Sequence, residues 1–247
     1  MNISEIEKYD LNGMHKIYDK WPKIARESYE FDHKQIDFGD ITHIVFAGMG
    51  GSGAIGDIFY SILSKAKIHV SLVKGYHLPS TVDSKTLVVT TSVSGNTVET
   101  LSVLESAINT GAKIVAFSSG GKMKDFCLNN KIEFRYIPME HSPRVSFPSF
   151  LYSMLKILEP VLPISKEEIL ESISEMEKTQ KIINSTKLTD ENTALKLAKW
   201  ITGIPLIYYP WGLQAAAIRF KNSLQENSKC HVISEDMIES CHNGIVI

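Results

Sequence analysis

The chain has 247 residues, which exceeds the usual size of one domain but is modest for two complete ones. Its 43% hydrophobic and 22% charged residues are typical of a globular protein with a substantial core, which argues against disorder. The formal net charge is -2, and 26 basic residues are scattered among 28 acidic ones. This balance lacks the basic footprint of a nucleic-acid-binding protein, so we expect no nucleic-acid partner.

The cysteines and the apolar segments indicate the cellular compartment. Cys127, Cys230 and Cys241 are odd in number and show neither a CxxC pair nor a zinc-ligand spacing. No apolar run approaches the ~20 residues of a membrane helix, and the first ten residues lack the pattern of a signal peptide. We therefore expect a cytoplasmic protein without a membrane partner.

In chain order, the first elements are a helical arm and a strand that ends in glycines. Apolar residues between positions 3 and 18 recur at roughly helical spacing and predict an amphipathic helical arm. Residues 41–48 form an apolar run with β-branched residues, and residues 54–66 follow with helical periodicity. The order is strand, tight turn, helix.

The same unit then repeats along the chain. Apolar runs at 67–76, 86–95, 113–123 and 132–139 predict further strands, with helical patterns between them. Alternating strands and helices predict an α/β fold with a doubly wound parallel sheet, covered on both faces.

The remaining segments predict a second, smaller unit. Residues 151–160 predict a helix, and Pro160 and Pro163 indicate a domain boundary, which gives domains 1–160 and 161–247. Ser165 is predicted to cap a charged helix over 165–185. Helix, strand, helix and strand patterns follow at 190–203, 204–212, 213–229 and 230–237. This second α/β unit is expected to be incomplete, because the sequence stops at Ile247.

The glycine cluster at 48–53 admits three interpretations. Gly48, Gly50 and Gly53 match G-x-G-x-x-G after a strand, which is the dinucleotide-binding pattern. That pattern also needs an acidic residue about 20 positions later, where this chain has Lys74 and Gly75 instead. A strand-to-helix turn without a ligand is the second interpretation, and a phosphate-binding loop is the third.

A second polar loop favours phosphate binding. Residues 90–97, TTSVSGNT, also lie between a strand and a helix and supply hydroxyl groups and backbone N–H groups at a positive helix end. In a parallel sheet both loops meet at the carboxyl edge, where ligands bind. One such loop is commonly only a capping turn. Two at corresponding places predict capture of a phosphate.

These residues resemble a known family. GGSG and SVSGNT are similar to the phosphate loops of the sugar isomerase (SIS) fold. Arg144 in its proline-arginine segment, the helix ending RFKNSLQENSK and the later HN pair resemble the bifunctional phosphoglucose/phosphomannose isomerases over most of the chain. The resemblance implies an SIS-type sheet, a second SIS-like domain, and isomerisation of glucose 6-phosphate and mannose 6-phosphate to fructose 6-phosphate through a cis-enediol.

The resemblance also assigns roles to individual residues. It implies that the sugar phosphate is held by Gly51, Ser52, Ser92, Ser94 and Thr97. It further implies that Glu226 is the catalytic base, that Arg144 stabilises the enediolate, and that His242 opens the sugar ring. His141, near Arg144, is a distant second candidate for the histidine. In the family the active site lies between two subunits, which implies a homodimer in which His242 serves the partner.

The residues themselves support the base. Leu213, Ala217, Phe220 and Leu224 form one apolar stripe on their helix, which leaves Arg219, Asn222 and Glu226 on a polar face. Such a face alone is more often merely solvated. Moving a proton between C1 and C2 needs a carboxylate base and a cation near the oxyanion, so no metal or redox cofactor is expected.

Two other functions remain open. A non-catalytic SIS module could bind a sugar phosphate as a regulatory ligand, and an isomerase of another phosphosugar would use the same loops. A carboxylate at position 226 favours an enzyme over a non-catalytic binding module. The pattern after residue 190 argues against an isomerase of another phosphosugar, because such enzymes usually have a single SIS domain.

Overall fold

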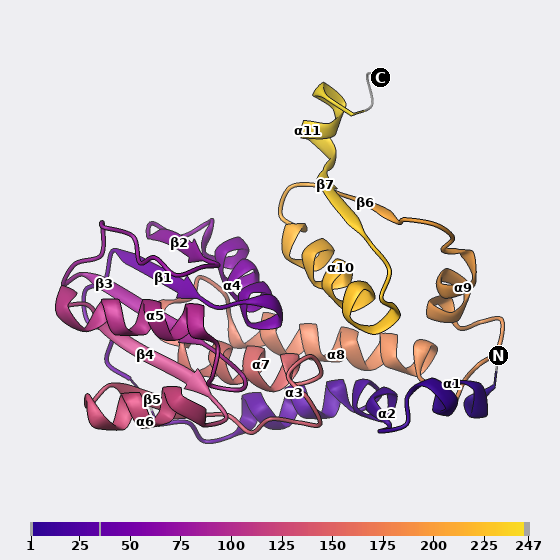
Figure 1. Cartoon of the computed structure of the whole chain (residues 1–247), viewed down its shortest axis with the longest axis horizontal. Helices are drawn as coiled ribbons and strands as arrows, with labels where there is room; N and C mark the ends of the chain where they lie inside the picture. Colours follow the sequence, from indigo (N-terminus) through magenta and orange to yellow (C-terminus); the bar gives the residue numbers. More distant parts are fainter. Residues whose placement is uncertain (1, 35, 245–247) are drawn as a thin grey trace. The chain divides into compact units, whose positions relative to one another are not determined.

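The computed structural model describes residues 2–34 and 36–244, which form two compact units (Figure 1). The helical unit contains the described residues of 2–34, 140–160 and 164–203. The sheet unit contains those of 36–139, 161–163 and 204–244. The two family-like domains expected at 1–160 and 161–247 stay a prediction.

A parallel sheet forms the centre of the sheet unit. Its strands are β1 (His43–Ala47), β2 (His69–Val73), β3 (Thr86–Thr91), β4 (Lys113–Ser118) and β5 (Glu133–Tyr136). Their order is β2-β1-β3-β4-β5, and every neighbouring pair is parallel. The predicted doubly wound α/β fold is therefore confirmed. β2 lies on one side of β1, and β3 lies on the other side, followed by β4 and β5. The direction in which strands are added therefore reverses between β1 and β3, which is the switch point of the sheet.

Helices cover both faces of this sheet. They are α4 (Gly50–Leu63), α5 (Val98–Ala107) with the 3-10 turn η1 (Ile108–Thr110), and α6 (Gly121–Asn129). Phe46 of β1 stacks on Phe59 of α4, with 5.0 Å between the ring centroids. The alternate residue Val45 packs with Val103 of α5 on the other face. The connection from β1 to β2 runs in the opposite direction along the sheet to those from β3 to β4 and from β4 to β5. Because such connections are right-handed, α4 lies on one face of the sheet and α5 and α6 lie on the other.

Residues 204–244 add a second, smaller α/β element to the sheet unit. β6 (Leu206–Tyr209) and β7 (Ile233–Asp236) pair in parallel, α10 (Gln214–Ser228) connects them, and α11 (Met237–His242) follows. The four predicted elements after residue 190 are therefore present, since the helix expected at 190–203 is α9 (Thr193–Trp200).

The helical unit is assembled from three separate stretches of the chain. Its other helices are α1 (Ile3–Tyr9), α2 (Met14–Tyr18), α3 (Trp21–Glu30), α7 (Phe147–Ile157) and α8 (Lys166–Ile183), with the 3-10 turn η2 (Glu159–Val161) after α7. α3 packs against α7 and α8. Ser165 caps α8 through a reciprocal bond with Glu168, as predicted.

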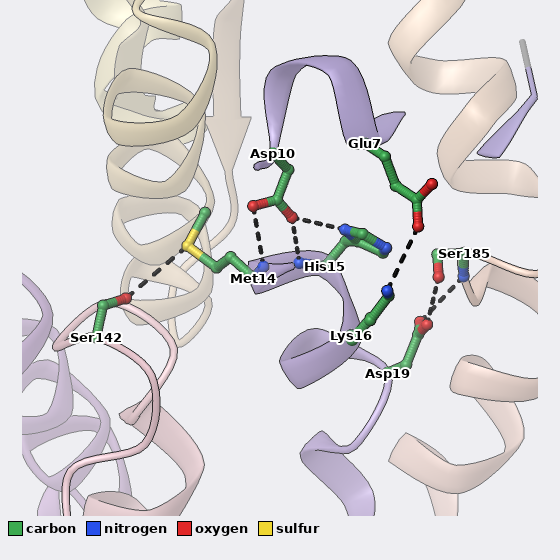
Figure 2. Close-up of polar contacts among 8 residues, drawn as sticks. All are labelled: Glu7, Asp10, Met14, His15, Lys16, Asp19, Ser142 and Ser185. Atoms are coloured by element: carbon green, nitrogen blue, oxygen red, sulfur yellow. Dashed lines mark hydrogen bonds and ion pairs between the residues drawn. The ribbon is translucent and has the colours of Figure 1, made fainter. Parts of the chain in front are cut away.

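The predicted helical arm is three short helices, and polar contacts fix its bends (Figure 2). The Asp10 carboxylate accepts hydrogen bonds from the backbone N–H groups of Met14 and His15 at 2.9 and 2.6 Å, and His15 Nδ1 lies 2.6 Å from it. Burial alone would raise the pKa of Asp10, but these bonds outweigh it and lower the pKa. The bend between α1 and α2 is therefore anchored by a charged carboxylate.

Within the described part of the chain, no helix is both long and apolar enough to cross a bilayer.

Candidate functional site

Two polar loops meet at the carboxyl edge of the sheet, on either side of its switch point. Ala47 of β1 is paired with Thr90 of β3, so the loops at 48–53 and 92–97 leave the sheet side by side. Each loop leads into a helix, α4 and α5 respectively. Backbone N–H groups of the first helical turn have no intrahelical partner and point toward this edge.

Close backbone approach explains the glycines of the first loop. A Cβ atom at Gly48 would lie 3.0 Å from the carbonyl oxygen of Thr91 and 3.1 Å from Ser52 Cβ. At Gly53 it would lie 2.8 Å from the carbonyl oxygen of Gly48. The loop is thus compact enough to hold the partly exposed Gly51 and Ser52 in the first turn of α4.

The second loop is ordered by its own hydroxyl groups. Ser92 is buried, and its Oγ lies 2.9 Å from Thr97 Oγ1 and accepts a hydrogen bond from Gly95 N at 3.1 Å. Thr97 is the N-cap position of α5, yet its side chain makes no capping bond. Ser94 is exposed, and its Oγ accepts from Asn96 N at 3.3 Å. Hydroxyl groups therefore surround the start of α5.

The arrangement suits a phosphate group. Gly51, Ser52, Ser92, Ser94 and Thr97 all lie on these two loops, at the ends of two helices whose positive poles favour an anion. Hydroxyl groups can donate to phosphate oxygens in place of the water that the anion loses.

Helix α10 presents a different face from the one expected. The stripe Leu213, Ala217, Phe220 and Leu224 does not form the buried side, because Leu213 is 55% exposed and Phe220 is 39% exposed. The buried residues are Ala215, Ala217 and Arg219, and α10 packs against α4. Ala215 and Arg219 share one side of the helix, whereas Ala217 lies about 200° from Ala215, so α10 is buried on two sides and also contacts β6 and β7. The predicted apolar stripe is therefore buried only in part, at Ala217, and Arg219, which was predicted on the polar face, is buried instead.

Arg219 is a residue of the site that sequence analysis placed only on a polar face. It is 9% exposed, and a Cβ atom at Gly51 would lie 3.7 Å from its Nη1. Its guanidinium group therefore lies beside Gly51 in the first turn of α4. No local sequence signal identifies this position, since it depends on how α10 packs on α4.

The residues expected to do the chemistry are distributed over both units. Glu226 is partly exposed near the end of α10, where its backbone carbonyl accepts a hydrogen bond from Lys229 Nζ at 2.7 Å. His242 is exposed at the end of α11. Arg144 is partly exposed in the turn before α7 and belongs to the helical unit, as does the exposed His141.

Two family descriptions match this sequence. Residues 38–157 match the SIS domain, and residues 190–247 match the bacterial phospho-glucose isomerase C-terminal SIS domain. The first range contains both polar loops, and the second contains α10 and α11. The expected second SIS-like domain is thereby confirmed.

Curated relatives extend over most of the chain. It is 33% identical to a bifunctional phosphoglucose/phosphomannose isomerase of Caldicellulosiruptor bescii, over 91% of this chain and 69% of that protein. A protein of Thermoplasma acidophilum with the same description is also 33% identical, over 90% and 66%. A D-glucosamine-6-phosphate 4-epimerase of Sulfolobus acidocaldarius is 28% identical over 94% and 72%. The chain spans about two thirds of the length of these relatives.

Solved structures share the fold. The tagatose-6-phosphate ketose/aldose isomerase of Escherichia coli superimposes with a TM-score of 0.65 at 16% identity, covering 96% of this chain and 65% of that one. The C-terminal domain of the glucosamine-fructose-6-phosphate aminotransferase of Francisella tularensis gives 0.66 at 17% identity, covering 94% and 72%. At such identities the likeness shows the SIS-type fold alone.

Proposed function

The chain belongs to the family of bifunctional phosphoglucose/phosphomannose isomerases, and we propose that it interconverts glucose 6-phosphate and mannose 6-phosphate with fructose 6-phosphate. The observation that supports this most directly is the pair of hydroxyl-rich loops at the switch point of the sheet. They offer a phosphate site where α/β sheets bind their ligands.

In this proposal the phosphate group anchors the sugar. Gly51, Ser52, Ser92, Ser94 and Thr97 hold it through backbone N–H groups and hydroxyls. Arg219, beside Gly51, adds a positive charge that favours a dianion at this end of α4. Binding energy from the phosphate, which does not react, is then available to orient C1 and C2 of the sugar.

The chemistry at the other end of the sugar is proton transfer. Glu226 removes the proton from C2 of the aldose and returns it to C1, so that a cis-enediol forms and collapses to the ketose. Arg144 stabilises the negative charge that develops on the enediolate oxygen. His242 donates a proton to the ring oxygen when the ring opens, because an imidazolium N–H is a proton donor.

The central test is the Glu226→Gln variant. We expect it to bind fructose 6-phosphate but to isomerise glucose 6-phosphate at least ~100-fold more slowly, the usual effect of removing a general base. Glu191→Gln, the same change at an exposed position of the helical unit, should retain wild-type turnover. Turnover is followed by proton NMR in a preparation free of host isomerase. Near wild-type turnover by Glu226→Gln would refute its role.

Binding measurements separate the phosphate site from the base. Ser94→Ala should raise the dissociation constant for fructose 6-phosphate while the far-UV circular dichroism stays unchanged. An unaltered dissociation constant for this variant and for Thr97→Ala would argue against the loops. The NMR products also distinguish 4-epimerisation, which keeps the aldehyde at C1 and would signal a reaction like that named for the Sulfolobus relative.

The proposal includes a homodimer that acts in the cytoplasm, in glycolysis and gluconeogenesis. Exposed apolar side chains support a subunit interface in the sheet unit: Leu206 and Tyr208 lie on β6, and Ile233 lies on β7. A parallel sheet is normally covered on both faces. In the proposed dimer, the second subunit covers the exposed apolar face of the β6–β7 sheet. In the dimer, His242 of one subunit serves the site that holds Glu226 of the other.

A further inference from the structure

The turn that carries Arg144 is held by side chains of the N-terminal arm on both of its sides. Trp21 Nε1 donates a hydrogen bond to the carbonyl oxygen of Val145 at 2.9 Å. Ser142 Oγ donates to Met14 Sδ at 3.8 Å, a contact that Figure 2 shows directly. Arg144 lies between these two anchored residues, only one and two positions away. All five residues belong to the helical unit.

The turn is also rigid in itself, so an anchor on it is transmitted to Arg144. The carbonyl oxygen of Ser142 accepts hydrogen bonds from Val145 N at 3.2 Å and from Ser146 Oγ at 2.8 Å. Ser146 Oγ in turn accepts from Glu140 N at 3.0 Å. Val145 and Ser146 are fully buried, which leaves the backbone around Arg144 little freedom.

The arm in turn is fixed at other points along its length. Asp10 anchors the start of α2, as described above, and Lys16 Nζ lies 3.4 Å from Glu7. Asp19 accepts hydrogen bonds from Ser185 N and Ser185 Oγ at 3.0 and 2.5 Å (Figure 2). Ser185 follows α8, so these bonds tie the arm to the segment after α8, just before α3 begins at Trp21.

Packing against two aromatic rings holds the Trp21 indole in the position from which it donates to Val145. Its ring lies 4.8 Å from the ring of Tyr18 and 6.3 Å from that of Phe147, measured between centroids. Phe147 begins α7, the helix that follows the Arg144 turn. The indole therefore contacts both the turn and the helix after it. The single N–H bond to a buried carbonyl contributes little to stability, so its main effect is on the geometry of the turn.

We propose that Trp21 is a positioning residue for Arg144, with Met14 as a weaker second anchor. The inference rests on the proposed function, in which Arg144 stabilises the enediolate. Transition-state stabilisation depends steeply on placement, and a displacement of about 1 Å can cost up to ~100-fold in rate. The phosphate is bound by loops of the other unit, so loss of the Trp21 anchor should lower kcat and leave KM nearly unchanged.

The test uses Trp21→Phe, which keeps an aromatic ring and removes the N–H donor. We expect kcat for glucose 6-phosphate to fall about tenfold, with KM within about twofold of wild type. Trp200→Phe is the matched control, because Trp200 is 78% exposed in the same unit. Met14→Leu keeps the apolar volume but removes the sulfur acceptor, and it should lower kcat about twofold. It also keeps the proposal testable if Trp21→Phe fails to fold.

A double-mutant cycle separates positioning from a general loss of structure. In an Arg144→Ala background, Trp21→Phe should no longer reduce kcat, because the residue through which it acts is absent. Trypsin gives a readout without activity, since it cleaves after Arg144: Trp21→Phe should speed cleavage of the Arg144–Val145 bond, and Trp200→Phe should not.

The outcomes divide cleanly. An equal reduction of kcat in the wild-type and Arg144→Ala backgrounds would overturn the inference, as would wild-type kcat for Trp21→Phe beside an Arg144→Ala variant whose kcat is reduced but measurable. Wild-type turnover by Arg144→Ala itself would instead refute the proposed role of Arg144, and this inference would fall with it.

Discussion

At the scale of single residues, Gly95 fixes the shape of the second polar loop. Its φ is +69°, and a Cβ atom there would lie 1.8 Å from the carbonyl oxygen of Gly120 and 2.6 Å from Ser118 Oγ. Neither backbone conformation nor space admits a side chain. The positions of the neighbouring Ser94 and Thr97 hydroxyl groups therefore depend on a residue without a side chain at position 95.

Gly95→Ala should be far more damaging than the left-handed conformation alone explains. Gly203 has nearly the same φ, +70°, with nothing within 4 Å of the corresponding Cβ position, so Gly203→Ala isolates the conformational cost of about 1 kcal/mol. We expect Gly95→Ala to lose at least ~3 kcal/mol of unfolding free energy, as severe overpacking does. Urea denaturation compares the two variants. Similar midpoints would contradict the close approach of residues 95 and 120.

Sequence patterns identify these residues well when the signal is local. The hydroxyl-rich loops and the capping serine Ser165 are predictable because turns and caps use residues adjacent in the chain. The position of Arg219 beside Gly51 is not predictable in this way, because it is set by the packing of α10 on α4. The sequence pattern of α10 alone places Arg219 on a solvated face, although the residue is buried.

At the scale of elements, an ion pair ties α4 to the end of β2. Lys74 Nζ lies 2.7 and 2.6 Å from the two carboxylate oxygens of Asp57, which is 6% exposed, whereas Lys74 is 39% exposed. The Lys74 stem also passes Gly53, where a Cβ atom would lie 3.4 Å from Lys74 Cε. A dinucleotide-binding protein would need an acidic residue at this position. Here the position holds Lys74, which pairs with the buried carboxylate of Asp57.

Removing the lysine should leave that carboxylate buried without compensation. We expect Lys74→Met to cost about 3 kcal/mol of unfolding free energy, at the low end for a buried pair because Lys74 is partly exposed. Asp57→Asn combined with Lys74→Met should recover most of the loss. Lys178→Met is the control, since its ion pair with Glu175 is exposed and should contribute little to stability. Equal losses in the two single variants would contradict this account.

The elements themselves follow from hydrophobic period. The strands β1 and β3 are short apolar runs with every residue buried, and the helices after them have a clear 3.6-residue pattern. α10 is the exception, because its buried residues are Ala215, Ala217 and Arg219, whereas the larger Leu213 and Phe220 are exposed. Period locates a helix, but the elements packed around it decide which of its residues are buried.

At the scale of the whole molecule, the proposed dimer makes a quantitative prediction. Glu226→Gln and His242→Ala should each be inactive alone. If the two groups meet from different subunits, equal mixing with subunit exchange should restore about a quarter of the wild-type activity, because half of the dimers are mixed and each has one intact site. Activity assays and light scattering test this. A monomer, or no recovery despite exchange, would rule out the shared site.

The helical unit is the part of the molecule that sequence analysis could not assemble. The arm, the Arg144 turn and α8 have local signals of their own, yet nothing local shows that α3 packs against α7 and α8. Such contacts join residues more than about a hundred positions apart, and periodicity contains no information about them.

This three-part assembly has a consequence for synthesis. Residues 2–34 leave the ribosome before any of residues 140–203 exist, whereas all five strands of the main sheet lie in between, at 43–136. Contiguous elements can fold as they emerge, but the arm must wait for partners that are made later. Its apolar side, including the buried Ile24 and Tyr29, stays without native cover during that interval. The segment translated first is thus among the last to reach its native place, and a nascent chain paused before residue 140 would expose it to chaperones.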